Sequence, residues 1–395
     1  NMSICGKQKN RDDFRLSLFI AGYYLLYACN EFIVLILGGN QVLRIFPKFL
    51  MLVLLCVAFK SIWKRMGSLF VAIEIILIVI YSVSYYIYGN VSSSILFPVM
   101  LYSVFLYLPL GICTYCIVDK ETLFVLLYNC SLIIQVILVI VLLKVGRMEQ
   151  ETYSMSAGYA LILSVLIISS HWLKTKKIYD VFFVMIDLII IVLFGSRGPI
   201  LCFIAFVLIH ICVSDVLSQR RKVVYAMIIV SAVGIFVFNY SFILSFVADI
   251  LESSGYSSRT LRLLLEGLGT YDAGRNSIQA RTLELIRQKP WFGWGAVGGR
   301  EVWGTPQYPH NIYLELFLCF GVPFGLLLSM VLTFIYIKGV LQKEPFSQML
   351  AIIFVSKIVG LLVSDSIFQC SEFFICIAFC LQGRLLFLRG SEGGK

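Results

Sequence analysis

The chain has 395 residues, of which 60% are hydrophobic and 14% are charged, and its net charge is +10. Soluble proteins carry about 45–50% apolar and about 25% charged residues, so a soluble fold would leave apolar surface uncovered. The composition therefore indicates a polytopic membrane protein. The excess of Lys and Arg then sets orientation and contacts anionic lipid headgroups, and it does not indicate nucleic-acid binding.

Twelve apolar runs along the chain are expected to be membrane-spanning helices, since about 20 apolar residues cross the hydrocarbon core. Helices are the only open structure that satisfies its own backbone in lipid. The second run is short, and Pro47 is expected to interrupt it. The expected spans are 16–38, 42–59, 68–88, 95–118, 122–143, 154–173, 178–195, 199–217, 223–247, 310–337, 346–365 and 369–388.

The basic residues between these spans predict the orientation. Nineteen Lys and Arg lie at the termini and in one set of loops, against five in the short loops on the other side. The positive-inside rule therefore places the first set and both termini in the cytoplasm. This predicts three parts: spans 1–9 in residues 1–247, a large exterior loop at 248–309, and spans 10–12 with a cytoplasmic C-terminus in 310–395.

The exterior loop is expected to contain two short amphipathic helices, at 257–268 and 277–288. The second is expected to begin after a cap at Asn276 or Ser277 and to stop before Pro290. Helices of this kind lie in the membrane interface with their apolar face toward lipid. The expected polar face of the second helix consists of Arg281, Glu284 and Gln288.

Arginines gather on the predicted exterior side, against the orientation rule. Arg197 lies in a tight turn between two apolar runs, where a charge near membrane depth marks a functional candidate. The exterior loop adds Arg275, Arg281, Arg287 and Arg300 among its cations. Arg is the side chain best suited to bidentate phosphate binding, so these residues are candidates for an anionic substrate group. A solvated face that binds lipid headgroups is the alternative for each of them.

His310 opens the tenth expected span and is the one His of three that faces the exterior beside these arginines. A neutral imidazole can take a proton from a hydroxyl group. A simple helix-start residue is the alternative. The exterior side has no Asp-x-Asp motif and no His cluster, so a carboxylate-type metal site is not expected.

These motifs occur in a recognisable order. A Gly195-Ser-Arg-Gly198 turn is followed by Gly274-Arg275, then by Pro290-x-x-Gly293-x-Gly295, and then by His310-Asn311 with Gly321 after nine residues. In order, sidedness and spacing, the pattern over about 185–330 resembles the O-antigen polymerase and O-antigen ligase superfamily of bacterial envelopes. The ligase signature has Gly, Thr or Tyr where this chain has Phe324, which favours a polymerase.

The resemblance implies an all-α membrane enzyme of the GT-C type with about 12 transmembrane helices and one large periplasmic loop. It implies a metal-independent, inverting glycosyltransferase without cofactor, in the bacterial inner membrane. Its active site would face the periplasm, with both termini cytoplasmic. The implied partners are a glycan donor and acceptor linked to undecaprenyl pyrophosphate, membrane lipids and a chain-length regulator, and no nucleic acid is expected.

The implied site residues follow the motifs. His310 is expected to deprotonate the acceptor hydroxyl, and Arg197 and Arg275 to stabilise the leaving pyrophosphate. Arg281 competes with Arg275 for the role of the large-loop arginine. An O-antigen ligase and, from another class, a lipid-linked oligosaccharide flippase are the alternative functions. The expected substrate-binding residues are Asn311, Tyr313, Arg287, Trp294 and Arg300.

Overall fold

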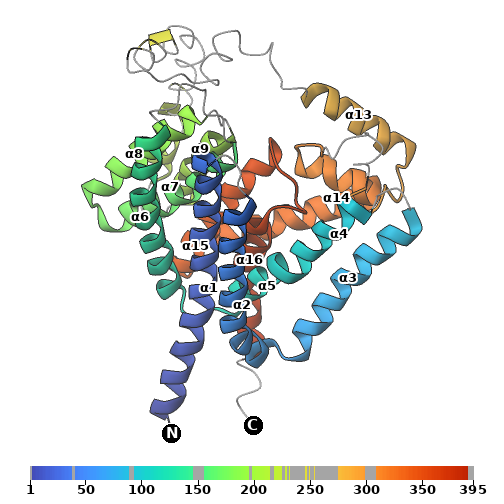
Figure 1. Cartoon of the computed structure of the whole chain (residues 1–395), viewed down its shortest axis with the longest axis horizontal. Helices are drawn as coiled ribbons and strands as arrows, with labels where there is room; N and C mark the ends of the chain where they lie inside the picture. The colour runs from blue at the N-terminus through green and yellow to red at the C-terminus, as the bar shows by residue number, and fades with distance from the viewer. Residues whose placement is uncertain are drawn as a thin grey trace. The chain divides into compact units, whose positions relative to one another are not determined.

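The computed structural model describes residues 2–37, 41–88, 93–145, 155–194, 198–213, 218–224, 275–298 and 308–389, with isolated residues between 227 and 253. All regular structure in these ranges is helical (Figure 1). The chain divides into two compact units, which are described in turn. Unit 1 contains residues 1–20, 55–123 and 272–395, and unit 2 contains residues 21–54 and 124–271.

Eight helices in the described ranges are long and apolar enough to cross a membrane, which confirms a polytopic membrane protein. They cover eight of the twelve expected spans, so twelve crossings are not established. The expected spans 199–217 and 369–388 correspond to the shorter apolar helices Gly198–Val213 and Ser371–Gln382. The expected span 178–195 is the 16-residue helix α8 (Ile178–Leu193), and most of 223–247 lies outside the described residues.

The first two helices are longer than their apolar runs. Helix α1 extends over Met2–Leu37 and α2 over Gln41–Met66. The prediction that Pro47 interrupts the second span is wrong, because α2 continues through it. At the other end of α2, Lys64 donates a hydrogen bond to Asp12 at 2.8 Å and Arg65 donates one to Asp13 at 2.8 Å. These ion pairs join the polar end of α2 to the polar part of α1.

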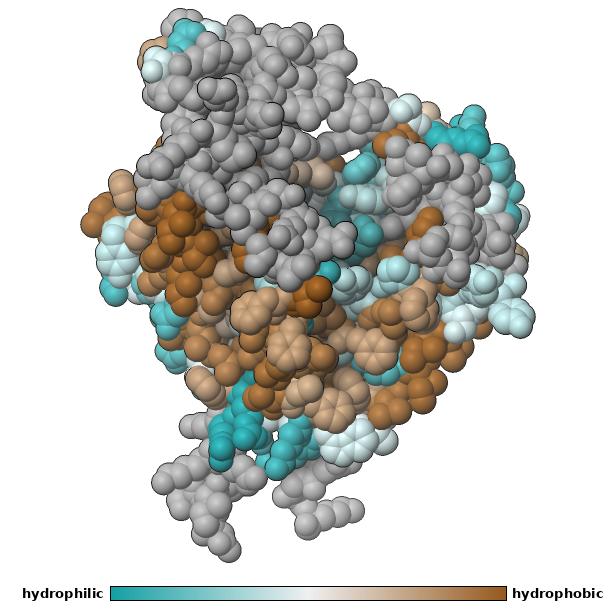
Figure 2. Space-filling view, in the orientation of Figure 1, coloured by the Kyte–Doolittle hydropathy of each residue, from teal (hydrophilic) through white to brown (hydrophobic). Residues whose placement is uncertain are grey.

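Helices α2 and α3 (Ser68–Tyr88) expose many large apolar side chains. Large apolar side chains such as Phe59 and Ile76 are more than 40% exposed there. Figure 2 shows such apolar side chains, in brown, over much of the described surface. A water-soluble protein rarely exposes apolar patches of this extent, so these faces fit contact with lipid.

Unit 2 is built around α7 (Met155–Thr175), of which every residue from Ala157 to Ser170 is buried. Helices α6 (Lys120–Val145), α8 and α9 (Gly198–Val213) belong to the same unit, and α7 packs against α8 and α9. The packing is close at the start of α9. A Cβ on Gly198 would lie 1.7 Å from the Tyr159 hydroxyl, so a larger residue there would require the Tyr159 side chain to move.

Buried polar groups tie the helices of unit 2 together. The Asp180 carboxylate of α8 is fully buried, lies 2.7 Å from Nδ1 of His171, and accepts a hydrogen bond from Tyr128 of α6 at 2.9 Å. In the middle of α8, Asp187 accepts a hydrogen bond from Gln135 of α6 at 2.8 Å. Because buried polar groups are costly unless they are hydrogen-bonded, these contacts lower the cost of placing two carboxyl groups inside the apolar runs.

Unit 1 contains α3, α4 (Ser93–Tyr102), a π-helical turn η1 (Ser103–Tyr107), α5 (Leu108–Cys116), α13 (Arg275–Gln288) and α14 (Ile312–Val340). It ends with α15 (Pro345–Ile358), a 3₁₀ turn η2 (Val359–Leu362) and α16 (Ser371–Arg389). Helices α5 and α16 pack side by side, and buried Gln382 of α16 donates hydrogen bonds to the carbonyls of Thr114 and Tyr115 at 3.0 Å.

Candidate functional site

The expected tenth span, 310–337, is not one straight helix. Helix α14 has a non-helical residue at Gly321, with φ 76° and ψ 170°, which separates a first segment (312–320) from a second segment (322–340). The hydroxyl of Tyr313 lies 3.4 Å from that of Thr333. In a straight helix, residues 20 apart are about 30 Å apart, so the two segments fold back on each other as a helical hairpin.

The sequence around the bend explains why the helix breaks there. In a continuous helix, the carbonyl of Cys319 would accept from the N–H of residue 323, but Pro323 has no N–H. The loop at 290–298 supplies the missing partners. Trp294 N–H donates to Leu318 O at 2.9 Å, Gly295 N–H donates to Cys319 O at 2.9 Å, and Val322 N–H donates to Pro290 O at 2.7 Å.

Two glycines make this docking sterically possible. A Cβ on Gly293 would lie 2.5 Å from the Gly321 nitrogen, and a Cβ on Gly321 would lie 2.4 Å from the Trp291 carbonyl oxygen. Both residues also have positive φ, at 67° and 76°, which glycine adopts without strain. The Pro-x-x-Gly-x-Gly motif and the Gly after His-Asn are therefore the two halves of one backbone contact.

The 290–298 loop also inserts into the core of unit 1. Ala296 and Val297 are about 1% exposed and pack with Tyr81 of α3 and with α4. The N–H of Ala296 donates to Ser84 at 3.0 Å. The loop thus joins α3 and α4 to the bend of α14, which fixes the start of α14 within this unit.

His310 lies directly before α14 and adopts a left-handed conformation with φ 53°. Its ring contacts that of Tyr308, with centroids 4.4 Å apart. The next residue, Asn311, caps the helix: its Oδ1 accepts from the N–H groups of Tyr313 at 3.0 Å and Leu314 at 3.2 Å. The Asn311 side chain therefore has a structural use, and its role in substrate binding stays a prediction.

Helix α13 confirms the expected second amphipathic helix of the large loop. It begins at Arg275, so the prediction of a cap at Asn276 or Ser277 is wrong. Its buried face, with Leu285 and Ile286, packs on Trp294 and Leu318. The expectation that this face meets lipid is therefore also wrong, because the face covers the first segment of α14.

The expected polar face of α13 is exposed. Arg281 forms an ion pair with Glu284 at 2.6 Å, and Arg287 and Gln288 are exposed on the same helix. Arg275 is the first residue of α13, and its side chain lies outside the described part of the structure. Arg197 and Arg300 lie outside the described residues. The choice between Arg275 and Arg281 stays open.

Trp294 is a core residue. Its ring is buried, its indole N–H donates to Leu285 O at 2.8 Å, and the Lys289 ammonium lies 4.0 Å from its ring centroid. Its expected role in substrate binding stays a prediction, although neighbouring Trp291 is 69% exposed and presents a more accessible ring. Among the described residues, no cluster of His, Cys, Asp or Glu has a metal-binding arrangement.

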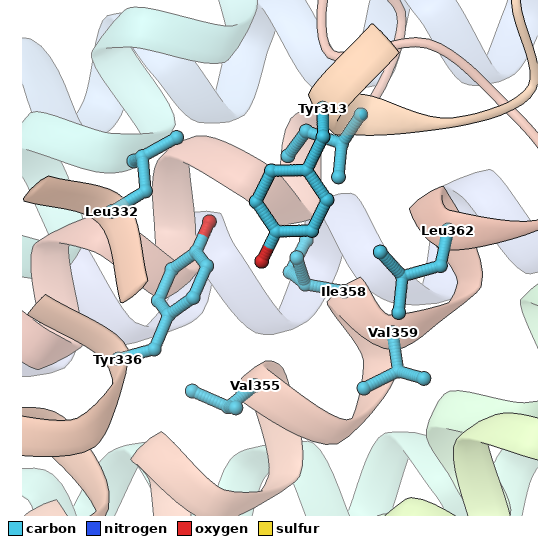
Figure 3. A pocket seen from close by; sticks show the side chains of 8 residues that line it. Tyr313, Leu332, Tyr336, Val355, Ile358, Val359 and Leu362 are labelled. Atoms are coloured by element: carbon cyan, nitrogen blue, oxygen red, sulfur yellow. The ribbon is translucent and has the colours of Figure 1, made fainter. Parts of the chain in front are cut away.

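An apolar cavity lies beside the start of α14. Its wall includes Tyr313, Leu332 and Tyr336 of α14 together with residues of α15 and η2. Figure 3 shows the hydroxyl groups of Tyr313 and Tyr336 turned toward one another across it. Leu362, in the wall of this cavity, accepts a hydrogen bond from Asn311 Nδ2 at 3.4 Å. Asn311 directly follows His310, so the cavity lies close to the start of α14.

The loop between η2 and α16 (residues 363–370, the α15–α16 loop) also contacts α14, which sequence analysis missed. Glu315, in the first turn of α14, accepts hydrogen bonds from Ser366 and Ile367. The only signal in the sequence was a cluster of polar residues, Ser364 to Ser366, after an apolar run. That cluster does not reveal its partner 51 residues earlier.

One part of the chain matches a known protein family. Residues 181–329 match the protein-family model Wzy_C, described as O-antigen ligase. The matched range includes most of α8, together with α9, α13, the 290–298 loop and the hairpin bend of α14. It also includes Arg197, Arg275, Arg281 and His310. No curated protein matches the chain.

Proposed function

We propose, from the premise that residues 181–329 form a domain of the O-antigen ligase/polymerase family, that this chain is an O-antigen polymerase. Members of this family are membrane glycosyltransferases that act on lipid-linked glycans. The proposed reaction joins repeat units carried on undecaprenyl pyrophosphate at the periplasmic face of the inner membrane. Both termini of the chain would then lie in the cytoplasm.

The observation that carries the proposal is the docking of the 290–298 loop on the bend of α14. It joins the two glycine motifs of the family signature in one backbone contact. The same unit holds His310 at the start of α14 and the exposed arginines of α13. A general base and cationic side chains are the groups that transfer from a pyrophosphate-linked donor requires.

In the proposed mechanism, the acceptor hydroxyl oxygen attacks the anomeric carbon of the donor sugar from the side opposite the pyrophosphate. The bond from the anomeric carbon to the pyrophosphate oxygen breaks, so the configuration inverts. His310 accepts the hydroxyl proton. Arg197, with Arg275 or Arg281, stabilises the charge on the departing undecaprenyl pyrophosphate.

A ligase that transfers the glycan to lipid A-core is the second candidate, because the matched family model is described as O-antigen ligase. Phe324 favours the polymerase, since the ligase signature has Gly, Thr or Tyr at this position. The two functions leave different lipopolysaccharide patterns when they fail. Loss of a polymerase still allows one repeat unit to reach the core, whereas loss of a ligase leaves polymer on the lipid carrier.

His310→Ala is therefore expected to replace the long lipopolysaccharide ladder with a single-repeat band when it complements a deletion strain. Gln288→Ala, on the exposed face of α13, is the matched control and is expected to restore the full ladder. Carrier-bound polymer with no repeat on the core would identify a ligase. A normal ladder in His310→Ala, at equal protein level, would remove His310 from the reaction.

A further inference from the structure

Glu315 is a buried carboxylate that the proposed mechanism does not use. It lies in the first turn of α14, five residues after His310, and is 3% exposed. Both of its oxygens are occupied by the α15–α16 loop: Oε1 accepts from the Ser366 hydroxyl at 2.5 Å and Oε2 from the Ile367 N–H at 3.0 Å. A buried acceptor that loses its partners bears the desolvation cost of the group, so these two bonds stabilise the contact between the loop and α14.

The loop that Glu315 holds is also fixed at its far end. Lys357, near the end of α15, lies 3.6 Å from Glu372 in the first turn of α16, and both side chains are largely buried. The Ser371 hydroxyl donates to the same carboxylate at 2.9 Å. The α15–α16 loop is therefore tied to α14 on one side and closed by an ion pair on the other.

Two residues at this junction have strained backbones. His310 has φ 53° and Asp365, in the α15–α16 loop, has φ 64°. A non-glycine residue in the left-handed region costs about 1–3 kcal/mol and persists only where its surroundings impose it. The described bonds made by the residues that follow His310 and Asp365 are the Asn311 cap, the Asn311 contact with Leu362, and the two bonds of Glu315.

We propose that Glu315 is a positioning residue, which fixes the α15–α16 loop against the start of α14 and thereby holds His310 in its strained conformation. This proposal rests on the proposed glycan transfer, because it assigns Glu315 a role in orienting the base. Its effect on the His310 environment does not depend on which reaction the chain performs.

Glu315→Ala should loosen the loop and release His310. In purified chain, modification of His310 by diethylpyrocarbonate, measured by peptide mass spectrometry, is expected to rise at least about threefold relative to His171. In the transfer assay, kcat is expected to fall about 10- to 100-fold while KM for the lipid-linked glycan stays within about twofold, since the loss is one of orientation. Glu315→Gln should recover part of both, because its amide oxygen still accepts one of the two bonds.

Two further variants keep the test decisive. Ser366→Ala removes one of the two bonds to Glu315, together with the bond that the Ser366 hydroxyl accepts from the Phe368 N–H at 3.3 Å. It should shift both readouts in the same direction by less, which covers the case in which Glu315→Ala does not fold. Glu344→Gln is the matched control. Glu344 caps the start of α15, accepting from the N–H groups of Phe346 and Ser347, and its substitution should leave His310 unaffected.

The outcomes separate the two claims. Unchanged His310 modification and unchanged kcat in Glu315→Ala would overturn the positioning role, as would a faster modification with full activity. A wild-type chain that transfers no glycan would overturn the proposed function. The ratio of His310 to His171 modification would then still decide whether Glu315 holds His310.

Discussion

Gly321→Ala is expected to disrupt the α14 hairpin and abolish activity. The residue has φ 76° and ψ 170°, a region essentially restricted to glycine, and alanine there costs about 1–3 kcal/mol. The new Cβ would also lie 2.4 Å from the Trp291 carbonyl oxygen. Moving that backbone breaks the three hydrogen bonds between the 290–298 loop and α14, each worth about 1 kcal/mol.

Gly67→Ala is the matched control for this effect. Gly67 also has a positive φ, 54°, but the nearest atom to a Cβ there is a carbonyl oxygen 3.9 Å away. Its substitution should therefore cost only the left-handed strain, about 1–2 kcal/mol. Thermal unfolding in detergent measures both variants. If Gly321→Ala unfolds at the same temperature as Gly67→Ala and keeps its activity, the backbone contact does not support the site.

Replacing the arginines of the proposed site with alanine is expected to cause the second large loss of glycan transfer. Arg197→Ala and Arg275→Ala should each reduce glycan transfer by about 100- to 1,000-fold, the loss typical when one stabilising donor of a developing anion is removed. Lys substitution should rescue only in part, because an ammonium cannot reproduce the bidentate fork of arginine. Polymer formation at equal protein level, followed on gels, measures these losses.

Arg281→Ala decides between the two arginines of α13. Arg281 pairs with Glu284 on an exposed face, so its loss should be small if Arg275 acts on the pyrophosphate. The opposite pattern, with full activity in Arg275→Ala and loss in Arg281→Ala, would transfer the role to Arg281. Lys343→Ala, an exposed cation outside the proposed site, serves as the charge control. Full activity in Arg197→Ala, Arg275→Ala and Arg281→Ala would contradict the assignment altogether.

The sequence predicts the helices well where length and hydropathy alone decide. The runs 68–88, 122–143 and 154–173 are helices within two residues of their expected bounds. The extension of α1 and α2 into polar sequence was not visible, because it depends on pairs such as Asp12 with Lys64 that lie 52 residues apart. A hydropathy profile does not show which distant residues form such ion pairs.

The hairpin in α14 shows why part of the site escaped prediction. Gly321 and Pro323 lie inside an apolar run that hydropathy treats as one crossing. Pro323 weakens the helix there, but the break is stabilised by hydrogen bonds from the 290–298 loop, a partner that hydropathy does not identify. For the same reason, Trp294 could be recognised as an aromatic residue of a glycine-rich loop but not as part of the core beneath α13.

Some of the residues that could take part in the reaction were predictable from the sequence. The motifs indicated His310 and Asn311, and the structure adds that Asn311 is the helix cap and that His310 is strained. Glu315 was invisible, since a single carboxylate in an apolar helix does not reveal that Ser366 and Ile367 are its partners. Arg197 and Arg300 lie outside the described residues, so their roles stay predictions.

Glycan transfer by the purified chain tests the central claim most directly. Undecaprenyl-pyrophosphate-linked repeat units are incubated with wild type and with His310→Ala in excess chelator, and the products are resolved by length. The account predicts carrier-linked glycans of increasing length from wild type, almost none from His310→Ala, and donor binding of similar affinity by both. If wild type extends no glycan, on the carrier or on added lipid A-core, the chain is not a glycosyltransferase of this kind.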